Sequence, residues 1–214
     1  MGYRIVKRSF DVFLSLLGLT ILSPVLLIVA IGIYISSPGP ILFKANRIGK
    51  NGEHFTMLKF RSMHLNNEKG HMITLRSDNR IFPFGRFLRK SKIDELPQLI
   101  NIVQGKMSIV GWRPEDDENV NKVFVGKYRE ILSIKPGLTS PGSLYDYTHG
   151  EQYEDEKAYE RDFLPQKMDL ELYYVKHRSF WYDVSLIGRT IITIIQVVIG
   201  KTDFSPPREI TLIK

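Results

Sequence analysis

The chain of 214 residues contains no cysteine. This absence excludes a disulfide framework, a cysteine-ligated metal site and a thiol nucleophile. Its five histidines show no paired spacing of the H-x-x-x-H kind, so the sequence carries no zinc motif. Internal repeats and low-complexity tracts are also absent. The length allows one domain with a real core, or a small domain attached to a membrane segment.

Acidic residues are the minority among the charged ones. The chain has 23 Asp and Glu against 30 Lys and Arg, which gives a formal net charge of +7. A basic balance favours an anionic partner, namely nucleic acid, an anionic membrane surface or a phosphorylated substrate.

Charge is missing altogether from residues 12 to 35, a stretch of about 24 residues that reads VFLSLLGLTILSPVLLIVAIGIYI. About 20 apolar residues suffice for a helix to span a bilayer core. A buried core helix is an alternative, but it would rarely be this long without a polar face. A secretory signal peptide would have a shorter apolar region and a small-residue cleavage site, which SSPGP does not supply. The stretch is therefore interpreted as a retained membrane segment.

Ser23 and Pro24 lie at the centre of this segment. Proline kinks a helix, and the serine hydroxyl can satisfy a backbone group that the kink frees. Basic residues flank the segment on both sides, whereas a straight span would carry one basic cluster across the membrane. A kinked transmembrane helix stays open as an alternative, and the symmetric charge favours a re-entrant helix that returns to the cytoplasmic side.

The remainder predicts an α+β fold, mainly helical with a short β-hairpin, in which the N-terminal re-entrant membrane helix and interfacial helices surround a cytoplasmic catalytic domain. Asn51-Gly52 predicts the hairpin turn. Helices are expected over 84–104 with one break, 119–133, 163–177 and 183–199, and a short strand over 108–111. Residues 64–80 are expected to form a polar loop, and 140–157 to be turn-rich. The 183–199 segment is interpreted as an interfacial helix, with a core helix or a second span as alternatives. The predicted divisions are 1–40 (membrane helix), 41–200 (catalytic domain) and 201–214 (tail).

Asp94 and Glu95 are the first candidates for chemistry. Pro97 predicts a helix start nearby, where free N–H groups and the helix dipole would favour anions. Several basic residues lie just upstream. Taken alone, Ser91-x-x-Asp94 is more simply explained as a capping box.

Two further sets of cations are candidates for phosphate binding. Pro114 restricts Arg113 to an extended conformation, from which its guanidinium could bind a phosphate bidentately. Lys59 and Arg61 are two residues apart, so on a strand they share one face and could meet a diphosphate. In isolation each set is more often a solvated surface.

Together, these motifs resemble one family. KRSFD is followed by the apolar stretch with its central Ser-Pro, and then by KFRSM, IDELPQLINIVQGKMSIVG, RPE, KPGLT and YYVKHRSFWYDVSLI. The sequence is similar to the bacterial sugar transferases, the small monotopic phosphoglycosyl transferases that begin lipid-linked glycan assembly. The resemblance covers about residues 4 to 200.

The resemblance implies transfer of a sugar phosphate from a UDP-sugar to polyprenyl (undecaprenyl) phosphate, with release of UMP, at the cytoplasmic face of the bacterial inner membrane. It implies that Asp94 attacks the β-phosphorus and becomes a phosphosugar ester, and that Glu95 binds Mg²⁺. Arg89 and Arg113 would hold phosphate, and Lys59 would lie in the same neighbourhood. The membrane helix would be broken at Ser23 and Pro24. No nucleic-acid partner is expected, and a homodimer stays open.

The chain departs from the family pattern in three places. Trp112 replaces the usual proline before Arg-Pro, and residues 139–142 read TSPG where T-G-W is common. Glu171, with Asp169 beside it, takes a position where many members have Asp, so Glu171 is a candidate substrate-binding residue. The sugar, the lipid length and the pathway are not specified by these residues.

Three other functions compete with this interpretation. A membrane-tethered basic module could bind anionic lipid or nucleic acid without catalysis. An inactive scaffold would not need Asp94, Glu95, Arg89 and Arg113 together. A transferase with a fully spanning helix would differ in topology and not in chemistry.

Overall fold

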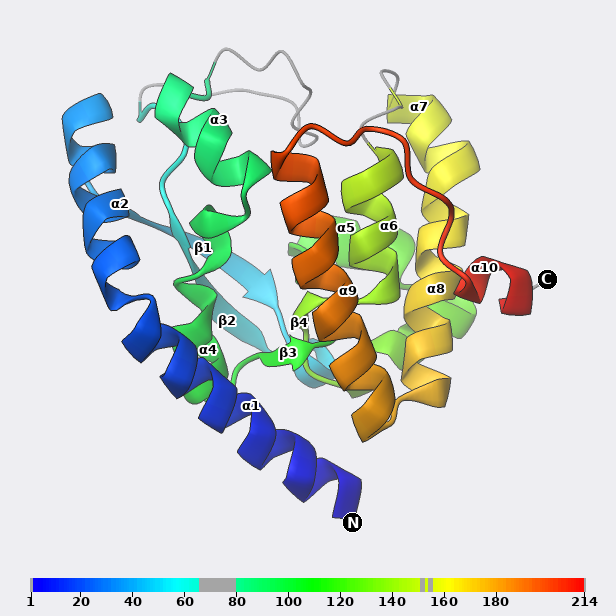
Figure 1. The fold of residues 1–214 in the computed structure, drawn as a ribbon. Helices are drawn as coiled ribbons and strands as arrows, with labels where there is room; N and C mark the ends of the chain where they lie inside the picture. Colours follow the sequence, from blue (N-terminus) through cyan, green and yellow to red (C-terminus); the bar gives the residue numbers. More distant parts are fainter. Residues whose placement is uncertain (1, 66–79, 151–152, 154–155, 214) are drawn as a thin grey trace.

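The computed structural model describes residues 2–65, 80–150, 153 and 156–213. Most of the expected loop at 64–80 lies outside this part of the chain. The helical elements and strands, in chain order, are α1 (Gly2–Ile21), α2 (Ser23–Ser36), β1 (Leu42–Ile48), η1 (Lys50–Gly52), β2 (His54–Phe60), α3 (Pro83–Lys90), η2 (Ile93–Glu95), α4 (Gln98–Val103), β3 (Ser108–Val110), α5 (Asp117–Val123), η3 (Gly126–Ser133), β4 (Gly137–Thr139), α6 (Pro141–His149), α7 (Glu156–Ala158), η5 (Tyr159–Phe163), α8 (Leu164–His177), α9 (Phe180–Val198) and α10 (Glu209–Ile213) (Figure 1).

The mainly helical α+β fold with a β-hairpin is confirmed. β1 and β2 pair antiparallel from Leu42 opposite Phe60 to Ile48 opposite His54. Asn51 and Gly52 form the turn, both with positive φ, as the Asn-Gly dipeptide predicts. The expected strand at 108–111 is β3, and it pairs in parallel with β4.

Two expectations for the middle of the chain are wrong. The predicted helix 119–133 is two elements, α5 and η3, because Gly126 adopts a φ of 54° at the start of η3. The turn-rich segment contains α6, which begins at Pro141 and is capped by the Ser140 hydroxyl accepting from the N–H of Ser143. Serine at the N-cap and proline at the first helical position start a helix here, although the same two residues are also common in turns.

Trp112 fills the centre of the largest apolar core. Its side chain is fully buried and meets the Phe124 ring edge-on at 5.1 Å between centroids. Its indole N–H donates to the carbonyl of Ile134, so the polar atom is satisfied. The other buried members of this core come from β1, α5, η3 and α8 (Ile48, Val120, Ile131, Met168, Leu172, Val175). The core thus holds α8 against the turn that carries Arg113.

The break at Ser23–Pro24 has a local cause. α1 and α2 meet at a bend of 62°. Pro24 has no N–H to offer the carbonyl of Thr20, and the hydroxyl of Ser23 donates to that carbonyl instead, at 2.8 Å. The serine therefore satisfies the acceptor that the proline leaves open.

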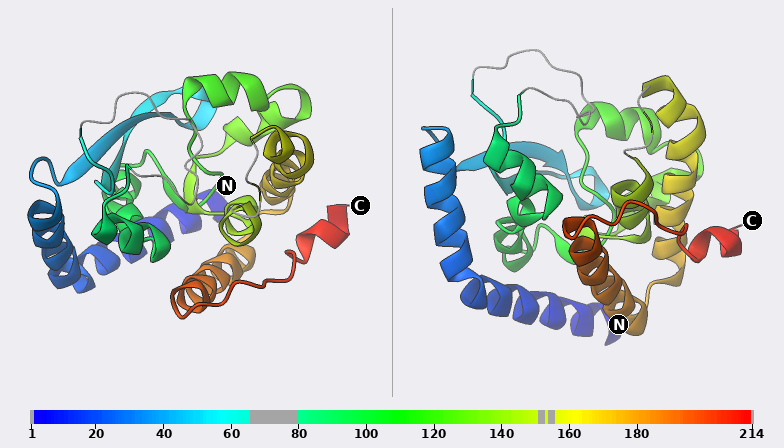
Figure 2. Two further views of the ribbon diagram at one scale, coloured as in Figure 1. Left: turned by 90° about the horizontal axis from the view of Figure 1, so that it is seen from above. Right: turned by 45° about the horizontal axis from the view of Figure 1, so that its top comes forward.

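The inner face of α1 is fastened to the rest of the fold by polar contacts. The Arg8 guanidinium donates to the carbonyls of Ile102 and Val103 at the end of α4. Asp183, at the start of α9, accepts hydrogen bonds from Tyr3 and Lys7. The two views of Figure 2 show α1 and α2 bent along one side of the molecule.

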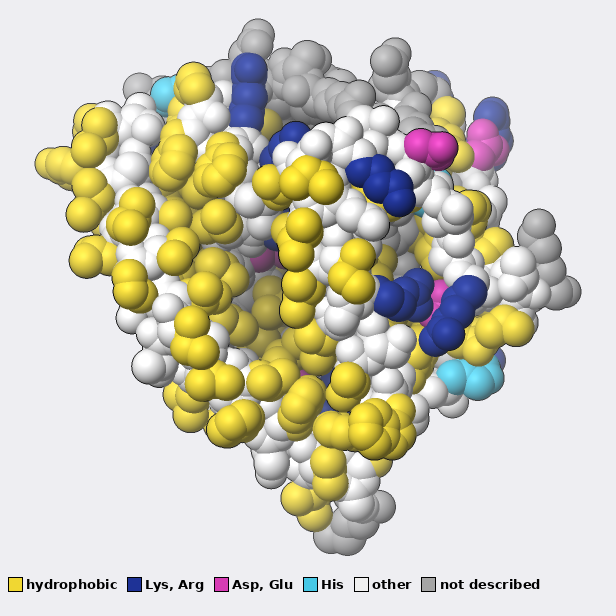
Figure 3. Space-filling view, in the orientation of Figure 1, with side chains coloured by type: hydrophobic (Ala, Val, Ile, Leu, Met, Phe, Trp, Pro, Cys, Tyr) yellow, Lys and Arg dark blue, Asp and Glu magenta, His cyan; other side chains and the backbone are white. Residues whose placement is uncertain are grey.

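Apolar side chains cover one face of the molecule, over α1, α2, α3 and α9 (Figure 3). The exposed large apolar residues of these four helices include Phe13, Leu27, Ile28, Ile35, Phe87, Trp181, Ile192 and Ile195. Among the described helices, α9 is the one single helix that is long and apolar enough to cross a membrane. The bent pair of α1 and α2 also meets these criteria if the two helices are counted as one span.

The C-terminal segment folds back over α9 and reaches α8 (Figure 1). Glu209 of α10 is 1% exposed. Its carboxylate accepts from Arg189 at 2.5 and 3.2 Å and from the Tyr182 hydroxyl at 2.9 Å. Arg189, the one cation inside the apolar 183–199 segment, thus has a buried counter-ion from the tail.

Candidate active site

Asp94 and Glu95 lie in the short turn η2, between α3 and α4. Lys92 leads into this turn with a φ of 57°, and Pro97 precedes the first residue of α4. The two acidic residues are only 5% and 8% exposed. Two adjacent buried carboxyl groups need nearby cations or protons to be tolerated.

The capping explanation for Asp94 is wrong. The Ser91 hydroxyl donates to the carbonyls of Phe87 and Leu88, so it ends α3 and does not cap a following helix. Among the described residues, no side chain caps η2 or α4. A helix cap therefore does not account for the acidic pair.

Three cations share Glu95. Its Oε1 lies 3.3 Å from Lys59 Nζ, 3.5 Å from Arg113 Nη1 and 3.8 Å from Lys92 Nζ. Burial alone would raise the pKa of Glu95, but these three charges lower the pKa far below its usual range. Glu95 is therefore an ionised carboxylate in a basic setting.

The pKa of Asp94 is shifted in the opposite direction, above its usual range. Burial is the main cause that raises its pKa, and neighbouring Glu95 adds to the rise, while Lys59, Lys92 and Arg89 partly offset both. Its Oδ1 atom is buried and has no hydrogen-bond partner in the described part of the chain. A bound metal ion would supply the missing partner for this oxygen.

The structure brings three of the predicted cations to this acidic pair. Lys59 comes from β2, and its burial lowers its pKa. Arg89 lies in the last turn of α3 and acts on Asp94 through its charge. Arg113 follows β3, where a close backbone approach fixes the turn, because a Cβ on Gly111 would lie 2.4 Å from the carbonyl of Lys135.

Arg61 lies elsewhere. It is 4% exposed and donates from its guanidinium to the hydroxyl and the carbonyl of Ser37. β2 ends at Phe60, so the alternation that would place Arg61 beside Lys59 ends before it. Its contacts fasten the exit of α2 and do not reach Glu95.

The donor set around the acidic pair suits Mg²⁺ in one mode. No group of three or more His, Asp or Glu that could hold a metal occurs in the part of the chain that the structure describes. Mg²⁺ is usually held through one or two carboxylates together with substrate phosphates. Asp94, with its unpartnered oxygen, and Glu95 fit that mode.

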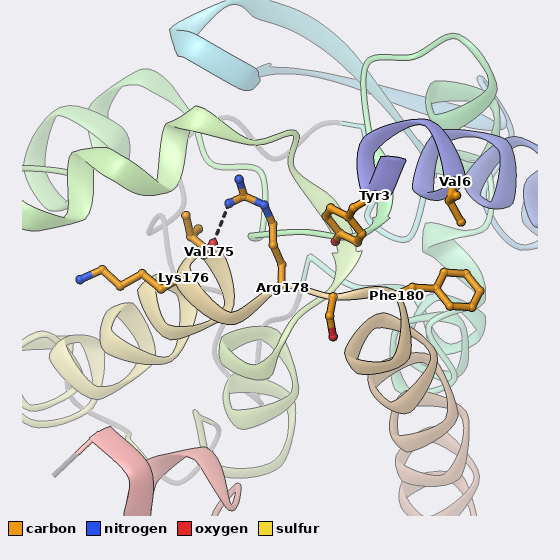
Figure 4. A pocket seen from close by; sticks show the side chains of 7 residues that line it. Tyr3, Val6, Val175, Lys176, Arg178 and Phe180 are labelled. Atoms are coloured by element: carbon orange, nitrogen blue, oxygen red, sulfur yellow. Dashed lines mark hydrogen bonds between the residues drawn. The ribbon is translucent and has the colours of Figure 1, made fainter. Parts of the chain in front are cut away.

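One hollow of the structure lies away from this site. It has a volume of about 550 Å³ and lies where α1 meets the α8–α9 connection, lined by Tyr3, Val6, Val175, Lys176, Arg178, Ser179 and Phe180 (Figure 4). Arg178 turns its guanidinium to the carbonyl of Val175. The buried charged residues around η2, and not this hollow, indicate where the chemistry takes place.

Comparison with known proteins assigns the family. The model of the family described as bacterial sugar transferase matches residues 2–197. The chain belongs to this family. The resemblance drawn from the motifs is thereby confirmed.

Three curated relatives illustrate the range of similarity. The UDP-N-acetylgalactosamine-undecaprenyl-phosphate N-acetylgalactosaminephosphotransferase of Aeromonas hydrophila is 34% identical, over 90% of this chain and 44% of the relative. The UDP-glucose:undecaprenyl-phosphate glucose-1-phosphate transferase of Escherichia coli (strain K12) is 34% identical, over 88% and 40%. The exopolysaccharide production protein PSS of Rhizobium leguminosarum bv. phaseoli is 36% identical, over 88% and 94%. The chain thus spans less than half the length of the first two.

Two acidic residues on α8 take different environments. Glu171 is 2% exposed, accepts from the Ser140 hydroxyl at 2.6 Å, and has no described partner for Oε2. Burial raises the pKa of Glu171 to about 7. Asp169 instead pairs with Lys127 and Tyr128 on the other side of α8. Of these two acidic residues, Glu171 is the one that lies next to the turn of Arg113 and so adjoins the site.

Sequence motifs carry no signal for a buried network that supports Arg113. Lys167 Nζ lies 3.2 Å from Asp146 Oδ2, and the Tyr159 hydroxyl donates to Asp146 Oδ1 at 2.9 Å. Burial lowers the pKa of Lys167, but Asp146, Tyr159 and Glu115 together raise it well above its usual range. The charge of Glu95 raises the pKa of Arg113 most, and Asp146 adds to the rise. Recognising α6 from its Ser140 cap and Pro141 would have been the first step toward finding Asp146.

Proposed function

We propose that the chain transfers a sugar 1-phosphate from a UDP-sugar to undecaprenyl phosphate and releases UMP. The observation that carries the proposal is Asp94, a buried carboxyl group with an unpartnered oxygen beside Lys59, Lys92, Arg89 and the Glu95–Arg113 pair. The names of the relatives, which describe undecaprenyl-phosphate sugar phosphotransferases, support the choice of donor and acceptor. The sugar itself is left unassigned.

In the first step, an oxygen of Asp94 attacks the phosphorus that bears the sugar. The bond between this phosphorus and the bridging oxygen breaks, and UMP leaves with the electron pair. The product is a phosphosugar joined to the Asp94 carboxylate as a mixed anhydride. The raised pKa of Asp94 suits a nucleophile, because a more basic carboxylate attacks more readily once it is ionised.

In the second step, a phosphate oxygen of the lipid attacks the same phosphorus. The Asp94–phosphorus bond breaks, the carboxylate is regenerated, and a diphosphate links lipid and sugar. Phosphate is repelled by a carboxylate, so both steps need cations around the transferring group. Lys59, Arg89 and Arg113 would supply that charge.

Glu95, together with Asp94, would hold Mg²⁺. Bound Mg²⁺ would offset negative charge on the diphosphate. Glu95 suits this role because it stays ionised over the whole physiological pH range.

We propose that α1 and α2 form a re-entrant membrane helix that enters and leaves on the cytoplasmic side of the inner membrane. The bend of 62°, the satisfied break at Ser23–Pro24 and the exposed apolar faces support this topology. The catalytic region, 41–200, would then lie against the membrane surface through α3 and α9, with 201–214 as its tail. The acidic pair follows α3 directly, so its phosphate chemistry would take place beside the lipid acceptor.

The test is UMP release by the full chain in lipid nanodiscs, with Mg²⁺, undecaprenyl phosphate and a panel of UDP-sugars. Wild type is compared with Asp94→Asn, and Asp169→Asn serves as the matched control because Asp169 pairs with Lys127 away from the site. The Asn variant of Asp94 is expected to lose activity by at least about 10³-fold, as for other removed nucleophiles. Mass spectrometry of the Asp94 peptide, after donor is added without lipid, should find the phosphosugar adduct.

Equal UMP release from wild type and Asp94→Asn would show that Asp94 is not the nucleophile. Lipid-vesicle or nucleic-acid binding that persists in Asp94→Asn, with no UMP from any donor in either protein, would favour the non-catalytic basic module.

A further inference from the structure

A second hollow lies at the tip of the β-hairpin, at the opposite end of α4 from the acidic pair. Its volume is about 250 Å³, and its walls come from η1 and the start of β2, from the residues after α4, and from Lys135 after η3. Three lysines line it, Lys50, Lys106 and Lys135, against one acidic residue, Glu53. Arg113 and the other residues of the proposed catalytic centre are not part of its wall.

Basic head groups converge on Gly105 in this wall. A Cβ placed on Gly105 would lie 3.5 Å from Arg8 Nη2 and 3.7 Å from Lys135 Nζ. Arg8 is held there by its hydrogen bonds to the carbonyls of Ile102 and Val103. Gly105 has a φ of 83° and no side chain, so the space beneath the two cations stays open.

These positive charges are only partly compensated. In the described part of the chain, none of the three lysines forms an ion pair with a carboxylate. Burial is the main cause that lowers the pKa of Lys135, and the charge of Arg8 lowers it further; Asp11 partly offsets this, and Lys50 and Lys106 add to the lowering. Like charges gathered in a partly enclosed hollow destabilise the fold, and a bound anion would relieve the repulsion.

Helix capping explains only one of the four cations. Cations near the end of a helix are favourable because the last carbonyls are free and the dipole is negative there. Arg8 already satisfies the carbonyls of Ile102 and Val103 at the end of α4. Lys50, Lys106 and Lys135 form no hydrogen bond of this kind among the described residues.

We propose that this hairpin-tip pocket binds a phosphate-bearing anion. The three lysines in the wall and Arg8 beside it outnumber the carboxylates of Glu53 and nearby Asp11, which suits a group with at least two negative charges, such as a phosphate monoester or a diphosphate. The volume equals that of about eight water molecules at about 30 Å³ each. It therefore suits a phosphate or diphosphate group rather than a whole nucleotide sugar. The group could belong to a free anion or to a lipid headgroup.

The test follows acylation of individual lysines by mass spectrometry, with inorganic pyrophosphate as the probe. The full chain is placed in nanodiscs of neutral phosphatidylcholine and labelled with and without pyrophosphate, and the ionic strength is matched with potassium chloride. For one site, the labelling of Lys106 and Lys135 should slow by about tenfold when pyrophosphate is ten times its Kd. Lys44, exposed on β1 and outside the pocket, is the internal control.

Two variants separate this site from the proposed catalytic centre. Lys106→Gln changes an exposed side chain, and it should reduce the protection of Lys135 by pyrophosphate. In Arg113→Gln, phosphate binding at the catalytic centre should be weakened, while protection of Lys135 persists. Equal labelling of Lys135 with and without pyrophosphate in wild type, or protection that disappears in Arg113→Gln, would overturn the proposal.

A further labelling experiment, with anionic lipid in place of pyrophosphate, identifies the source of the anion. Protection of Lys135 in phosphatidylglycerol nanodiscs without pyrophosphate would identify a lipid headgroup as a ligand. Protection by pyrophosphate alone would identify a free phosphate-bearing anion. Both results support the pocket.

Discussion

The Ser108 hydroxyl donates a hydrogen bond of 2.7 Å to Asp11 Oδ2, across 97 positions of the sequence. Asp11 is 4% exposed on the inner face of α1, and its other oxygen accepts from the N–H of Ile109. Ser108 and Ile109 belong to β3, the strand that leads into the turn of Arg113. The helix that we propose enters the membrane is thus joined to the strand next to Arg113, the arginine that we propose binds phosphate.

Asp11→Ala should lower the thermal unfolding temperature markedly. It leaves the buried hydroxyl of Ser108 and the partly buried N–H of Ile109 without acceptors, at about 1–3 kcal/mol for each group that stays buried. Asp169→Ala, which removes an exposed pair with Lys127, should cost at most about 1 kcal/mol. Thermal unfolding in detergent, followed by intrinsic fluorescence, compares the two. Equal shifts would show that the Asp11 contact does not hold α1 in place.

Lys92→Gly and Lys92→Ala should separate stability from activity. Lys92 has a φ of 57°, where a residue with a Cβ is strained by about 1–2 kcal/mol relative to glycine. Both variants lose the ammonium group near Glu95, so both should lose transferase activity to a similar extent. The glycine variant should nevertheless unfold at a higher temperature than the alanine variant. If alanine proves the more stable of the two, the backbone strain at this position is not significant.

Glu171 should make stability depend on pH. Its pKa is about 7 in the folded protein, above the usual carboxyl value, because of burial. The folded state therefore keeps a proton that the unfolded state loses, and the stabilising effect is complete below about pH 4.5. It is lost as pH rises through about 7, and at about 1.4 kcal/mol per pKa unit the total is on the order of 3 kcal/mol. Glu171→Gln cannot ionise, so its unfolding temperature relative to wild type should rise between pH 5 and pH 8. A constant difference over that range would argue against the raised pKa.

Glu209→Ala should be among the most destabilising single changes in the chain. It leaves Arg189 and Tyr182 without their buried partner, and breaking a buried ion pair on one side costs about 3–5 kcal/mol. The double variant Arg189→Leu/Glu209→Leu removes both charges and should recover part of the loss. Glu118→Ala, on the exposed side of α5, is the control. Chemical denaturation measures the free energy of unfolding of the three variants. A double variant that is no more stable than Glu209→Ala would contradict the ion-pair explanation.

The proposed topology can be tested because the chain has no native cysteine. Gly2→Cys and Lys201→Cys place single thiols at exposed positions on either side of the membrane elements. In inside-out vesicles, a membrane-impermeant maleimide should label both if the helix is re-entrant. With Pro24→Ala, the backbone bond to Thr20 can form and the helix can straighten, so labelling of the Gly2→Cys thiol should fall. Labelling of only one thiol in the otherwise unchanged chain would show a full span.

Local signals predict much of the site, and tertiary packing decides the rest. Asp94 and Glu95 are recognisable because their motif is continuous in sequence, and Lys59 because it lies within a predicted strand. Arg61 is misplaced by the same reasoning because the end of β2 at Phe60 depends on its pairing with Leu42 and not on its own sequence. The link from Arg113 to Asp146 and Lys167 joins three separate elements, and no spacing rule reports such a contact.

The carboxylate that neutralises Arg189 lies beyond residue 197, where the family match ends. A protein shortened to the boundary drawn by similarity would keep the arginine on an apolar helix and discard its counter-ion. Such a truncated chain would be prone to aggregate or lose activity for a reason unrelated to the transferase chemistry. Boundaries for expression should therefore follow the buried ion pair and retain α10.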